Sequence, residues 1–485
     1  MIKLSKLLEN IKLIELFDSN ISINSISSDH RKSSENDLFI ALRGVEIDSH
    51  IYIKDAISKK VAAVICEHIP TDCPQNFNYI LVKDTRKILG QVASNYYDNP
   101  SSKLKLIGIT GTNGKTTVAT LLRNLFKNLG YKTALISTIQ NQIGDTVLPS
   151  THTTPDPITL NNLLATMVEQ QCTFCFMEVS SHAVDQNRIG GLTFAGGIFT
   201  NITHDHLDYH HTFENYLAAK KSFFDGLPSA AFALTNKDDK NGQVMLQNTK
   251  ASKFTYSLKS VSDFKGKIIE NDLEGLLFEI DKTQAWYSLS GEFNAYNLLA
   301  AYGAAFIMGL DSETIIKTLS KTEGAKGRFE IIRSESGILG VVDYAHTPDA
   351  LKNVLETINK VRSRNETLIT IIGCGGDRDR EKRPIMGHYA SQLSDRVIFT
   401  SDNPRSENPE DIIEQMRSGV KAQNFKKILK ITNREEAIHV AVSQAKKGDI
   451  ILLAGKGHEN YQETKGEKIH FDDSEKLKHA FETLN

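Results

Sequence analysis

The sequence has no long apolar segment, and this absence argues against a protein with membrane-spanning helices. No stretch approaches the roughly 20 apolar residues that a membrane-spanning helix needs. Residues 1–17 alternate charged and apolar side chains, and they have neither the uncharged core nor the cleavage site of a signal peptide. We therefore expect a protein without a transmembrane segment that works in the cytoplasm.

Cysteine is also scarce. The 485 residues include five cysteines, which form no disulfide framework and fit a reduced compartment. Cys172 and Cys175 have the C-x-x-C spacing of some redox sites, but they lead into the apolar segment 174–179, which reads as a strand. Buried structural thiols are therefore favoured over a redox site.

An excess of charge of one sign is missing as well. The chain carries 57 basic and 59 acidic residues, a formal net charge of −2, which argues against a general nucleic-acid binder. Any anionic ligand must be held by local Arg and Lys side chains. The length, with 40% hydrophobic residues, suits about three domains.

What the sequence does contain is a phosphate-binding pattern. An apolar segment at 105–110 leads into a glycine loop, and a helix-periodic segment follows from residue 115. Glycine would let backbone N–H groups turn toward a polyphosphate, Lys115 would reach its outer phosphates, and Thr116 would offer a hydroxyl to Mg²⁺. Ile109 stands where the usual pattern has its first glycine, so an ordinary glycine-rich turn is the alternative. The loop comprises Gly111, Thr112, Asn113, Gly114, Lys115, Thr116 and Thr117.

The order of expected strands and helices predicts three α/β domains. Residues 1–90 resemble a small α/β domain that opens with a helix, and residues 91–327 hold the phosphate loop in a doubly wound sheet like that of P-loop ATPases. Residues 328–485 again alternate strands and helices, as a Rossmann-like domain does.

Several polar residues of the middle region are candidates for chemistry. Glu178 ends an apolar strand, where ligands gather in open parallel sheets and a carboxylate can hold Mg²⁺. The histidine-rich segment 204–211 suggests zinc, but the other ligands of a closed zinc site are not at useful spacing. Tyr216 and Lys220 share one face of a helix predicted at 213–224. A solvated helix lysine is the alternative for Lys220, because sequence spacing alone does not distinguish the two.

Ten motifs then occur in the order seen in the Mur ligase family, which the chain resembles from about residue 25 to 462. Within that family the chain is most similar to the diaminopimelate-adding members. The motifs are GTNGKTT, EVSSH, TNITHDHLDYH, YLAAK, FNAYNLLAA, GRFE, DYAHTPDAL, GCGGDRDREKRP, DNPR and GKGHE.

The resemblance implies a reaction. ATP phosphorylates the terminal carboxylate of UDP-MurNAc-L-Ala-D-Glu, and the amine of meso-diaminopimelate attacks the acyl phosphate, which gives an amide, ADP and phosphate in peptidoglycan synthesis. The resemblance also implies two Mg²⁺ ions, held by Thr116, Glu178, His206 and a carbamylated Lys220. The catalytic residues would be Lys115, Glu178, His206 and Lys220.

Two further sets of residues follow from the same resemblance. ATP would also contact Asn294, Asn297, Arg328, Asp343 and His346. The nucleotide-linked dipeptide would contact Ser28, His30, Thr153, Thr154, Ser180, Gln186, Arg188 and Lys220. The first domain departs from the family pattern at His30 and in the loop after Gly44, which begins Val45-Glu46, so the uridine contacts stay open.

The amino-acid substrate should be decided in the last domain. Diaminopimelate differs from lysine by a second carboxylate, which the Arg405 guanidinium suits, while Glu459 could receive the distal ammonium. The full set is Arg378, Asp402, Asn403, Pro404, Arg405, Gly455 and Glu459. A lysine-adding ligase, a folylpolyglutamate synthase and a catalytically inactive nucleotide-binding protein are the alternatives. We expect a monomer with mobile outer domains.

Overall fold

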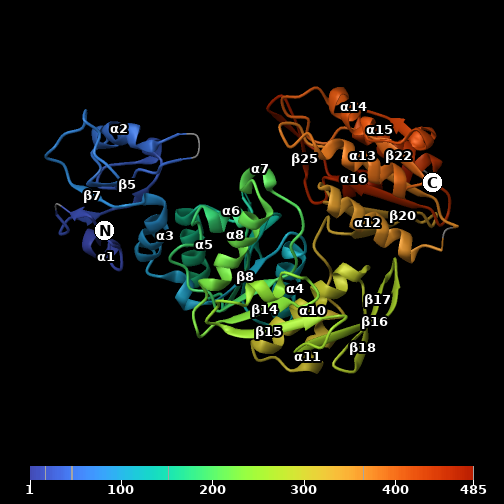
Figure 1. Ribbon diagram of the computed structural model, residues 1–485, viewed down its shortest axis with the longest axis horizontal. Helices are drawn as coiled ribbons and strands as arrows, with labels where there is room; N and C mark the ends of the chain where they lie inside the picture. The colour runs from blue at the N-terminus through green and yellow to red at the C-terminus, as the bar shows by residue number, and fades with distance from the viewer. Residues whose placement is uncertain (17, 45–46, 151, 364, 484–485) are drawn as a thin grey trace.

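The computed structural model describes residues 1–16, 18–44, 47–150, 152–363 and 365–483. It forms three lobes in chain order, with the N-terminal lobe and the C-terminal lobe at opposite ends of the molecule (Figure 1). Residues Val45 and Glu46, where the sequence departs from the family pattern, lie outside the described residues. In the part of the chain that is described, no helix is long and apolar enough to cross a membrane.

The N-terminal lobe is a five-stranded sheet in the order β2-β7-β6-β5-β4, with β2 antiparallel and the others parallel. Its elements are β1 (Ile2–Lys3), α1 (Leu4–Leu7), β2 (Glu15–Leu16), β3 (Ser22–Ile23), β4 (Ile26–Ser27), η1 (His30–Lys32), β5 (Leu38–Ile40), η2 (Ser49–Tyr52), α2 (Ile53–Ser58), β6 (Ala63–Cys66), β7 (Tyr79–Leu81) and α3 (Thr85–Tyr96).

The opening helix predicted from the sequence is wrong in its extent. Only Leu4–Leu7 is helical, because Ile2–Lys3 pairs with β3 and Glu15–Leu16 pairs with β7. Pairing with a sheet edge outweighs the helical spacing of this short segment. The domain boundary expected after residue 90 falls inside α3, whose buried residues Leu89, Val92 and Ala93 pack into the N-terminal core.

The central lobe is built on an eleven-stranded sheet in the order β11-β10-β9-β12-β8-β13-β14-β15-β16-β17-β18. Its strands from β9 to β16 in that order are parallel, which confirms the doubly wound prediction. Its first elements are η3 (Pro100–Lys103), β8 (Lys105–Thr110), α4 (Lys115–Asn128), β9 (Thr133–Ile136), β10 (Gln140–Ile143), β11 (Thr146–Pro149), α5 (Pro157–Glu169), β12 (Phe174–Glu178), α6 (Ser181–Asp185) and β13 (Gly196–Phe199).

The remaining central elements extend the sheet by an antiparallel hairpin and add helices to both of its faces. They are α7 (Leu207–His210), α8 (Phe213–Asp225), β14 (Phe232–Asn236), α9 (Gly242–Met245), β15 (Ser252–Ser257), β16 (Phe264–Asp272), β17 (Gly275–Ile280), β18 (Thr283–Tyr287), α10 (Glu292–Ile307) and α11 (Ser312–Leu319). Helices α4 and α10 pack on each other and share one core with the β8 side chains Ile107 and Ile109. The cysteines are all buried and unbridged, as expected.

The C-terminal lobe has a six-stranded sheet in the order β19-β20-β24-β21-β22-β23, parallel except for β19. The mixed α/β class predicted for this part of the chain is confirmed. Its elements are β19 (Glu330–Arg333), β20 (Leu339–Asp343), α12 (Pro348–Val361), β21 (Leu368–Ile372), α13 (Lys382–Leu393), β22 (Arg396–Phe399), α14 (Pro409–Ser418), η4 (Ala422–Lys427), β23 (Ile428–Lys430), α15 (Arg434–Gln444), β24 (Ile450–Ala454), β25 (Tyr461–Thr464), β26 (Glu467–His470) and α16 (Asp473–Thr483).

Candidate active site

The phosphate loop connects the end of β8 to the start of α4, as the sequence predicts. Gly114 has φ +87, and a Cβ there would lie 2.4 Å from Asn297 Oδ1. Gly111 has φ +151, and a Cβ there would lie 1.9 Å from Thr200 Oγ1. Both positions therefore require glycine, since a side chain would be strained in its backbone and would clash.

Lys115 folds back over this loop. Its Nζ donates hydrogen bonds to the carbonyl oxygens of Gly111 at 2.9 Å and Thr112 at 2.8 Å. Desolvation lowers the pKa of Lys115, while the nearby carboxylates of Glu178 and Asp205 act in the opposite direction. A cation held in this way at a helix N-terminus is suited to the oxygens of a polyphosphate.

Glu178 ends β12 beside the loop, and its carboxylate is fully buried. Oε1 accepts hydrogen bonds from Thr116 Oγ1 and the Thr138 amide, both at 2.8 Å, and Oε2 accepts one from Thr138 Oγ1 at 3.1 Å. These three donors are neutral, so a bound cation would compensate a charge that they only solvate. Thr138 is missing from the sequence prediction because a threonine after a strand carries no distinctive signal.

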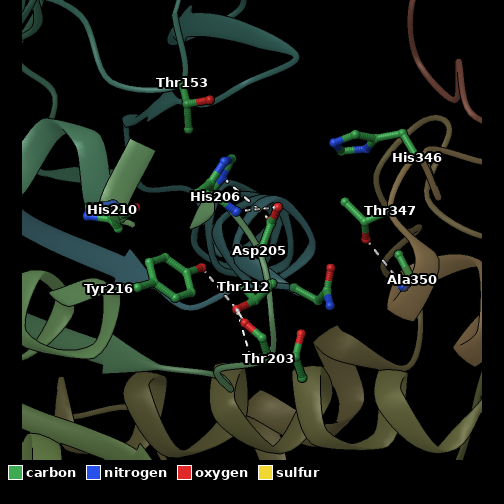
Figure 2. Close-up of polar contacts among 12 residues, drawn as sticks. Thr112, Thr153, Thr203, Asp205, His206, His210, Tyr216, His346, Thr347 and Ala350 are labelled. Carbon is green, nitrogen blue, oxygen red and sulfur yellow. Dashed lines mark hydrogen bonds and ion pairs between the residues drawn. The ribbon is translucent and has the colours of Figure 1, made fainter. Parts of the chain in front are cut away.

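Two further polar residues, Asp205 and His206, lie near Thr112 of the loop (Figure 2). His206 precedes α7 with φ 54, and its Nε2 lies 3.5 Å from Asp205 Oδ2. Burial would raise the pKa of Asp205, but the charges of His206 and Lys115 and the hydrogen bond from the His206 amide outweigh it and lower the pKa. Asp205 therefore stays an anion in the cavity, a role that the sequence analysis did not assign to it.

Lys220 lies behind the phosphate loop, on α8. Its Nζ donates to Gly111 O at 3.0 Å and lies 4.6 Å from the ring centroid of Tyr216, which confirms that these two side chains share a helix face. The Tyr216 hydroxyl contacts Thr112 Oγ1 at 3.0 Å. Burial, reinforced by Lys115, lowers the pKa of Lys220 well below its ordinary value, so its amine is readily neutral.

The C-terminal lobe supplies the opposite wall. Arg328 Nη2 donates to Thr116 Oγ1 at 3.3 Å, and the guanidinium lies 4.5 Å from the centroid of the Tyr344 ring. Burial raises the pKa of Asp343 to about 6, although Arg328 and the Phe329 amide, 2.7 Å from Oδ2, act against the rise. An arginine thus crosses between lobes to the phosphate loop.

His346 faces the central lobe across the cavity (Figure 2). Its Nδ1 donates to Tyr344 O at 2.8 Å, which leaves Nε2 as an acceptor. Desolvation and the charge of Lys382 lower the pKa of His346 to about 4, so the ring is neutral at neutral pH.

These walls enclose one cavity of about 480 Å³ between the central and C-terminal lobes. Its lining includes most of the predicted ATP and metal residues: Thr112, Asn113, Gly114, Lys115, Thr116, Thr117, Glu178, His206, Asn297, Arg328, Asp343 and His346. It also includes Thr153 and Ser180 of the dipeptide set. Polar lining residues that the sequence analysis missed are Thr138, Asn201, Thr203, Asp205, Asn236, Asp238, Asp239, Tyr296, Tyr344, Thr347 and Asn353.

Other predicted residues stand behind this lining. Asn294 donates to Ser290 O and accepts from Asn297 Nδ2 at 3.1 Å, so it orients Asn297. Thr154 Oγ1 donates to the Glu178 carbonyl oxygen at 2.8 Å. Arg188 donates to Thr154 O at 2.9 Å and, through two nitrogens, to Gln186 Oε1. Thr154, Gln186 and Arg188 thereby form one connected network beside Glu178.

Ser28 and His30 lie in the N-terminal lobe and do not line this cavity. The His30 ring stacks on Tyr52 with centroids 4.1 Å apart. A stacked imidazole and phenol form an aromatic surface in the lobe that the resemblance associates with uridine.

The side chains near the phosphate loop fit Mg²⁺ better than zinc. Within the described ranges, no group of three or more His, Cys, Asp or Glu is arranged to hold a metal ion, so the zinc alternative gains no support. The buried Glu178 carboxylate and the Thr116 hydroxyl are hard oxygen donors beside a phosphate loop. They fit Mg²⁺, which takes few protein ligands and completes its shell with water and phosphate oxygens.

The predicted amino-acid residues gather in the C-terminal lobe, outside the cavity lining. Asn403 Nδ2 donates to Glu459 Oε2 at 2.7 Å. The buried Lys456 Nζ, which the sequence analysis did not single out, lies 3.4 Å from the same oxygen and 3.9 Å from Asp402 Oδ1. Burial and the charge of Asp402 raise the pKa of Glu459, against the effect of Lys456.

Glycine and arginine complete this group. Gly455 has φ +111, and a Cβ there would lie 2.7 Å from Asp402 Oδ2. Arg405 Nη1 donates to Gly376 O at 2.7 Å, and its Nε lies 3.7 Å from Glu463. Arg378 is exposed, and Pro404 is buried. Residues 378, 402–405 and 455–459 thus come together from three separate loops.

Comparison with known proteins agrees with this architecture. Residues 109–305 match the Mur ligase middle domain, and residues 327–457 match the Mur ligase glutamate ligase domain. A UDP-N-acetylmuramoyl-L-alanyl-D-glutamate–2,6-diaminopimelate ligase of Cytophaga hutchinsonii is 55% identical over 467 residues, which are 96% of each chain. A solved structure of a ligase with the same name is 33% identical, covers 100% of this chain and 99% of its own, and has a TM-score of 0.72.

A more distant solved structure contains a bound nucleotide. The MurF ligase of Thermotoga maritima in complex with ADP is 19% identical, with a TM-score of 0.62 over 95% of this chain and 97% of its own, and shows a shared fold. Because a relative is 55% identical over nearly the whole length, and two family domains match in order, this chain belongs to the Mur ligase family.

Proposed function

We propose that this chain is an ATP-dependent, ADP-forming ligase that joins meso-diaminopimelate to UDP-MurNAc-L-Ala-D-Glu. The observation that carries the reaction class is the cavity in which Arg328 reaches from the C-terminal lobe to Thr116 of the phosphate loop. The 55% identity to a ligase named for this reaction supports the substrates. Peptidoglycan synthesis is then the process that the product serves.

In the first step the dipeptide carboxylate attacks the γ-phosphorus of ATP. A P–O bond forms, the bond to the β-phosphate oxygen breaks, and ADP leaves. Lys115 and Arg328 bring two cations to the phosphate loop, where negative charge spreads over the transferring oxygens. Asn297, Asp343 and His346 line the same cavity and would orient the nucleoside.

In the second step the neutral amine attacks the acyl phosphate carbon and forms a C–N bond, the nitrogen releases a proton to solvent, and the C–O bond of the tetrahedral intermediate breaks as phosphate leaves. Thr116 and Glu178 would hold one Mg²⁺, and Glu178, His206 and a carbamate on Lys220 would hold a second. Such ions supply charge neutralisation on the phosphate oxygens. Glu459 would receive the distal ammonium of the amino acid, and Arg378 and Arg405 would hold its carboxylates.

Carbamylation of Lys220 is part of the proposal. A neutral amine can add CO₂ with loss of a proton, and the lowered pKa of Lys220 favours the neutral form. The anion formed would replace a donor with an oxygen ligand for a hard cation. ¹³C NMR with labelled bicarbonate should show a carbamate signal that Lys220→Arg removes, and a signal retained in Lys220→Arg would refute the assignment.

The proposal extends to the domains, the oligomeric state and the location of the protein. The chain divides into an N-terminal uridine-binding domain, a central ATP domain and a C-terminal amino-acid domain, near the boundaries expected at 90/91 and 327/328. The protein acts as a monomer, which light scattering can check. We place it in the cytoplasm because ATP is its cosubstrate.

The decisive experiment is phosphate release with ATP, Mg²⁺ and UDP-MurNAc-L-Ala-D-Glu, comparing meso-diaminopimelate with L-lysine. We expect turnover with diaminopimelate, and its loss in Arg405→Ala, while Arg417→Ala, which changes an exposed arginine of the same lobe, keeps it. A preference for lysine would show that lysine is the amino-acid substrate, and the ligase reaction would stand. Absence of turnover with both would favour an inactive nucleotide-binding protein.

A further inference from the structure

Two loops of the C-terminal lobe carry the arginines proposed to bind the carboxylates of the amino acid. Loop 373–381 follows β21 and contains Arg378, and loop 400–408 follows β22 and contains Arg405. The strands β21 and β22 are neighbours, so both loops leave the same edge of the sheet. The spacing of the two guanidiniums depends on how these loops are fixed to each other.

Two ion pairs outside the proposed binding set join them, both to Glu407: Arg380 Nη2 lies 3.3 Å from Glu407 Oε2, and Arg383 forms the more extensive pair. Arg383, on the first turn of α13, has no exposed side-chain surface, and its Nη2 and Nη1 donate to the two carboxylate oxygens of Glu407, each at 2.9 Å. Arg383 Nη2 also donates to Gly375 O at 3.1 Å, and Nη1 donates to Gln415 Oε1 at 2.7 Å. One side chain therefore holds both loops and the helix that follows the second.

Glu407 completes the connection from the other side. Its Oε1 accepts the amide N–H of Asp377 at 2.6 Å, the residue that directly precedes Arg378. The hydrogen bond from Arg383 lowers the pKa of Glu407 to about 2, so the carboxylate is ionised at neutral pH. The pair is thus a permanent charged bridge between the loops.

The backbone of both loops is held in conformations that need such support. Asp377 has φ 52 and Arg405 has φ 50, a left-handed region that residues other than glycine seldom adopt. A Cβ at Gly376 would lie 1.9 Å from Pro404 O, so the loops touch without any room between them. Ser406 adds a side-chain hydrogen bond to Asp377 Oδ1 at 2.6 Å.

We infer that Arg383 and Glu407 are positioning residues that set the spacing and direction of Arg378 and Arg405, and thereby the affinity for the amino-acid substrate and its distal carboxylate. Neither side chain needs to touch the substrate. The inference rests on the proposed function for the identity of that substrate, and on the contacts above for the bridge itself.

The test replaces the bidentate fork without removing the charge. Arg383→Lys keeps a cation but cannot bond both oxygens of Glu407 together with Gly375 O. We expect the KM for meso-diaminopimelate to rise about tenfold or more, as for a misplaced binding group. The KM values for ATP and for the nucleotide-linked dipeptide should stay within about twofold, since only one subsite changes. The preference for diaminopimelate over lysine should fall as well.

A matched control is present in the same lobe. Arg362 pairs with Asp395 and bonds Glu366 O at 3.0 Å, beside the start of β21 rather than its end. Arg362→Lys should leave all three KM values unchanged. Equal changes in every KM for both variants, with equal loss of thermal stability, would show a merely structural role and overturn the inference.

A second variant protects the test against misfolding. Arg383→Met/Glu407→Leu replaces a buried ion pair with apolar groups, a change that proteins often tolerate. It should fold and show the same selective rise in KM for diaminopimelate. An unchanged KM in this folded variant would overturn the inference.

Hydrogen exchange tests the bridge between Arg383 and Glu407 independently of which amino acid is the substrate. In the variants, the amides of Gly376 and Asp377 should lose protection relative to native protein, because they bond Asn403 O and Glu407 across the loops. If native enzyme prefers lysine, the proposed substrate is wrong and the same KM test is read with lysine. If it turns over neither amino acid, retained amide protection in the variants would still refute the bridge.

Discussion

The two polar sites of this protein are built in opposite ways. The phosphate loop is one contiguous segment between β8 and α4, and its cation, Lys115, is held by carbonyl oxygens of the loop itself. The amino-acid site is assembled from residues 373–381, 400–408 and 455–459, which meet through contacts between loops such as the Gly376 amide with Asn403 O and Asn403 with Glu459. A local site depends on a few residues of one turn, whereas an assembled site depends on every pair that connects its loops.

The two sites also differ in the partners of their cationic side chains. In the phosphate loop, Lys115 is bound to backbone carbonyls and stays available to a ligand. In the assembled site, the cations Arg405, Lys456 and Arg383 are already paired with carboxylates or carbonyls of the lobe. A substrate there must exchange partners with the protein, so its affinity is sensitive to small displacements.

The largest effect should come from the local site. Lys115→Ala removes the cation nearest the phosphates, and we expect turnover to fall by roughly 10³-fold, as when a main electrostatic contact to a transition state is lost. Thermal stability should change little. Lys127→Ala, on the exposed end of the same helix, is the control and should be fully active. Comparable activity in both variants would refute the role of the loop lysine.

A smaller and more selective effect is expected at the assembled site. Glu459→Gln removes the charge proposed to receive the distal ammonium, and the loss of a charged hydrogen bond, about 2 kcal/mol, corresponds to a rise of about 30-fold in the KM for diaminopimelate. The KM for ATP should not move. Glu475→Gln changes an exposed carboxylate of the same lobe and should leave both constants at native values.

The interface between the two sites should respond to pH through Asp343. Its pKa of about 6 means that the carboxylate is ionised at neutral pH and protonated below pH 6. If ATP needs the ionised form, its KM should rise about tenfold from pH 7 to pH 5, where only about a tenth of the group is ionised. Asp343→Asn should show a higher KM without this pH dependence.

The same group makes an opposite contribution to stability. Because folding raises the pKa of Asp343 above its ordinary 3.8, the group stabilises the folded state at low pH, and this contribution is lost as the pH rises through 6. Asp343→Asn should therefore gain thermal stability relative to native protein more at pH 8 than at pH 4. The reverse order would contradict the burial of this carboxylate.

The smallest effect is expected on stability alone, at a helix cap outside both sites. Asp156 caps α5, where its Oδ1 accepts the amides of Ile158 at 3.0 Å and Thr159 at 3.1 Å. Asp156→Ala should lower the free energy of unfolding by about 1 kcal/mol. All three KM values should stay native, which shows that a modest loss of stability does not imitate the selective effects above. A selective rise in one KM would remove that distinction.

The sequence by itself determined most of the central site and the class of the fold. The strand, glycine loop and helix at 105–128 are as predicted, and so is the approach of Tyr216 to Lys220, because each rests on neighbours in the chain. The sequence could not reveal Thr138 and Asp205, whose roles depend on side chains more than 35 residues distant, Glu178 and Lys115 respectively. It also predicted too long a helix at the N-terminus.

Only the tertiary structure decided that Arg328 reaches Thr116, that Arg383 and Glu407 join two loops, and that Leu4–Leu7 alone is helical. The physical reason is the same in each case. Hydrogen bonds within a strand, a turn or a helix follow from residues a few positions apart, and the sequence displays them. Contacts between loops are fixed by the order of strands in a sheet, and their energies enter only when distant segments have packed.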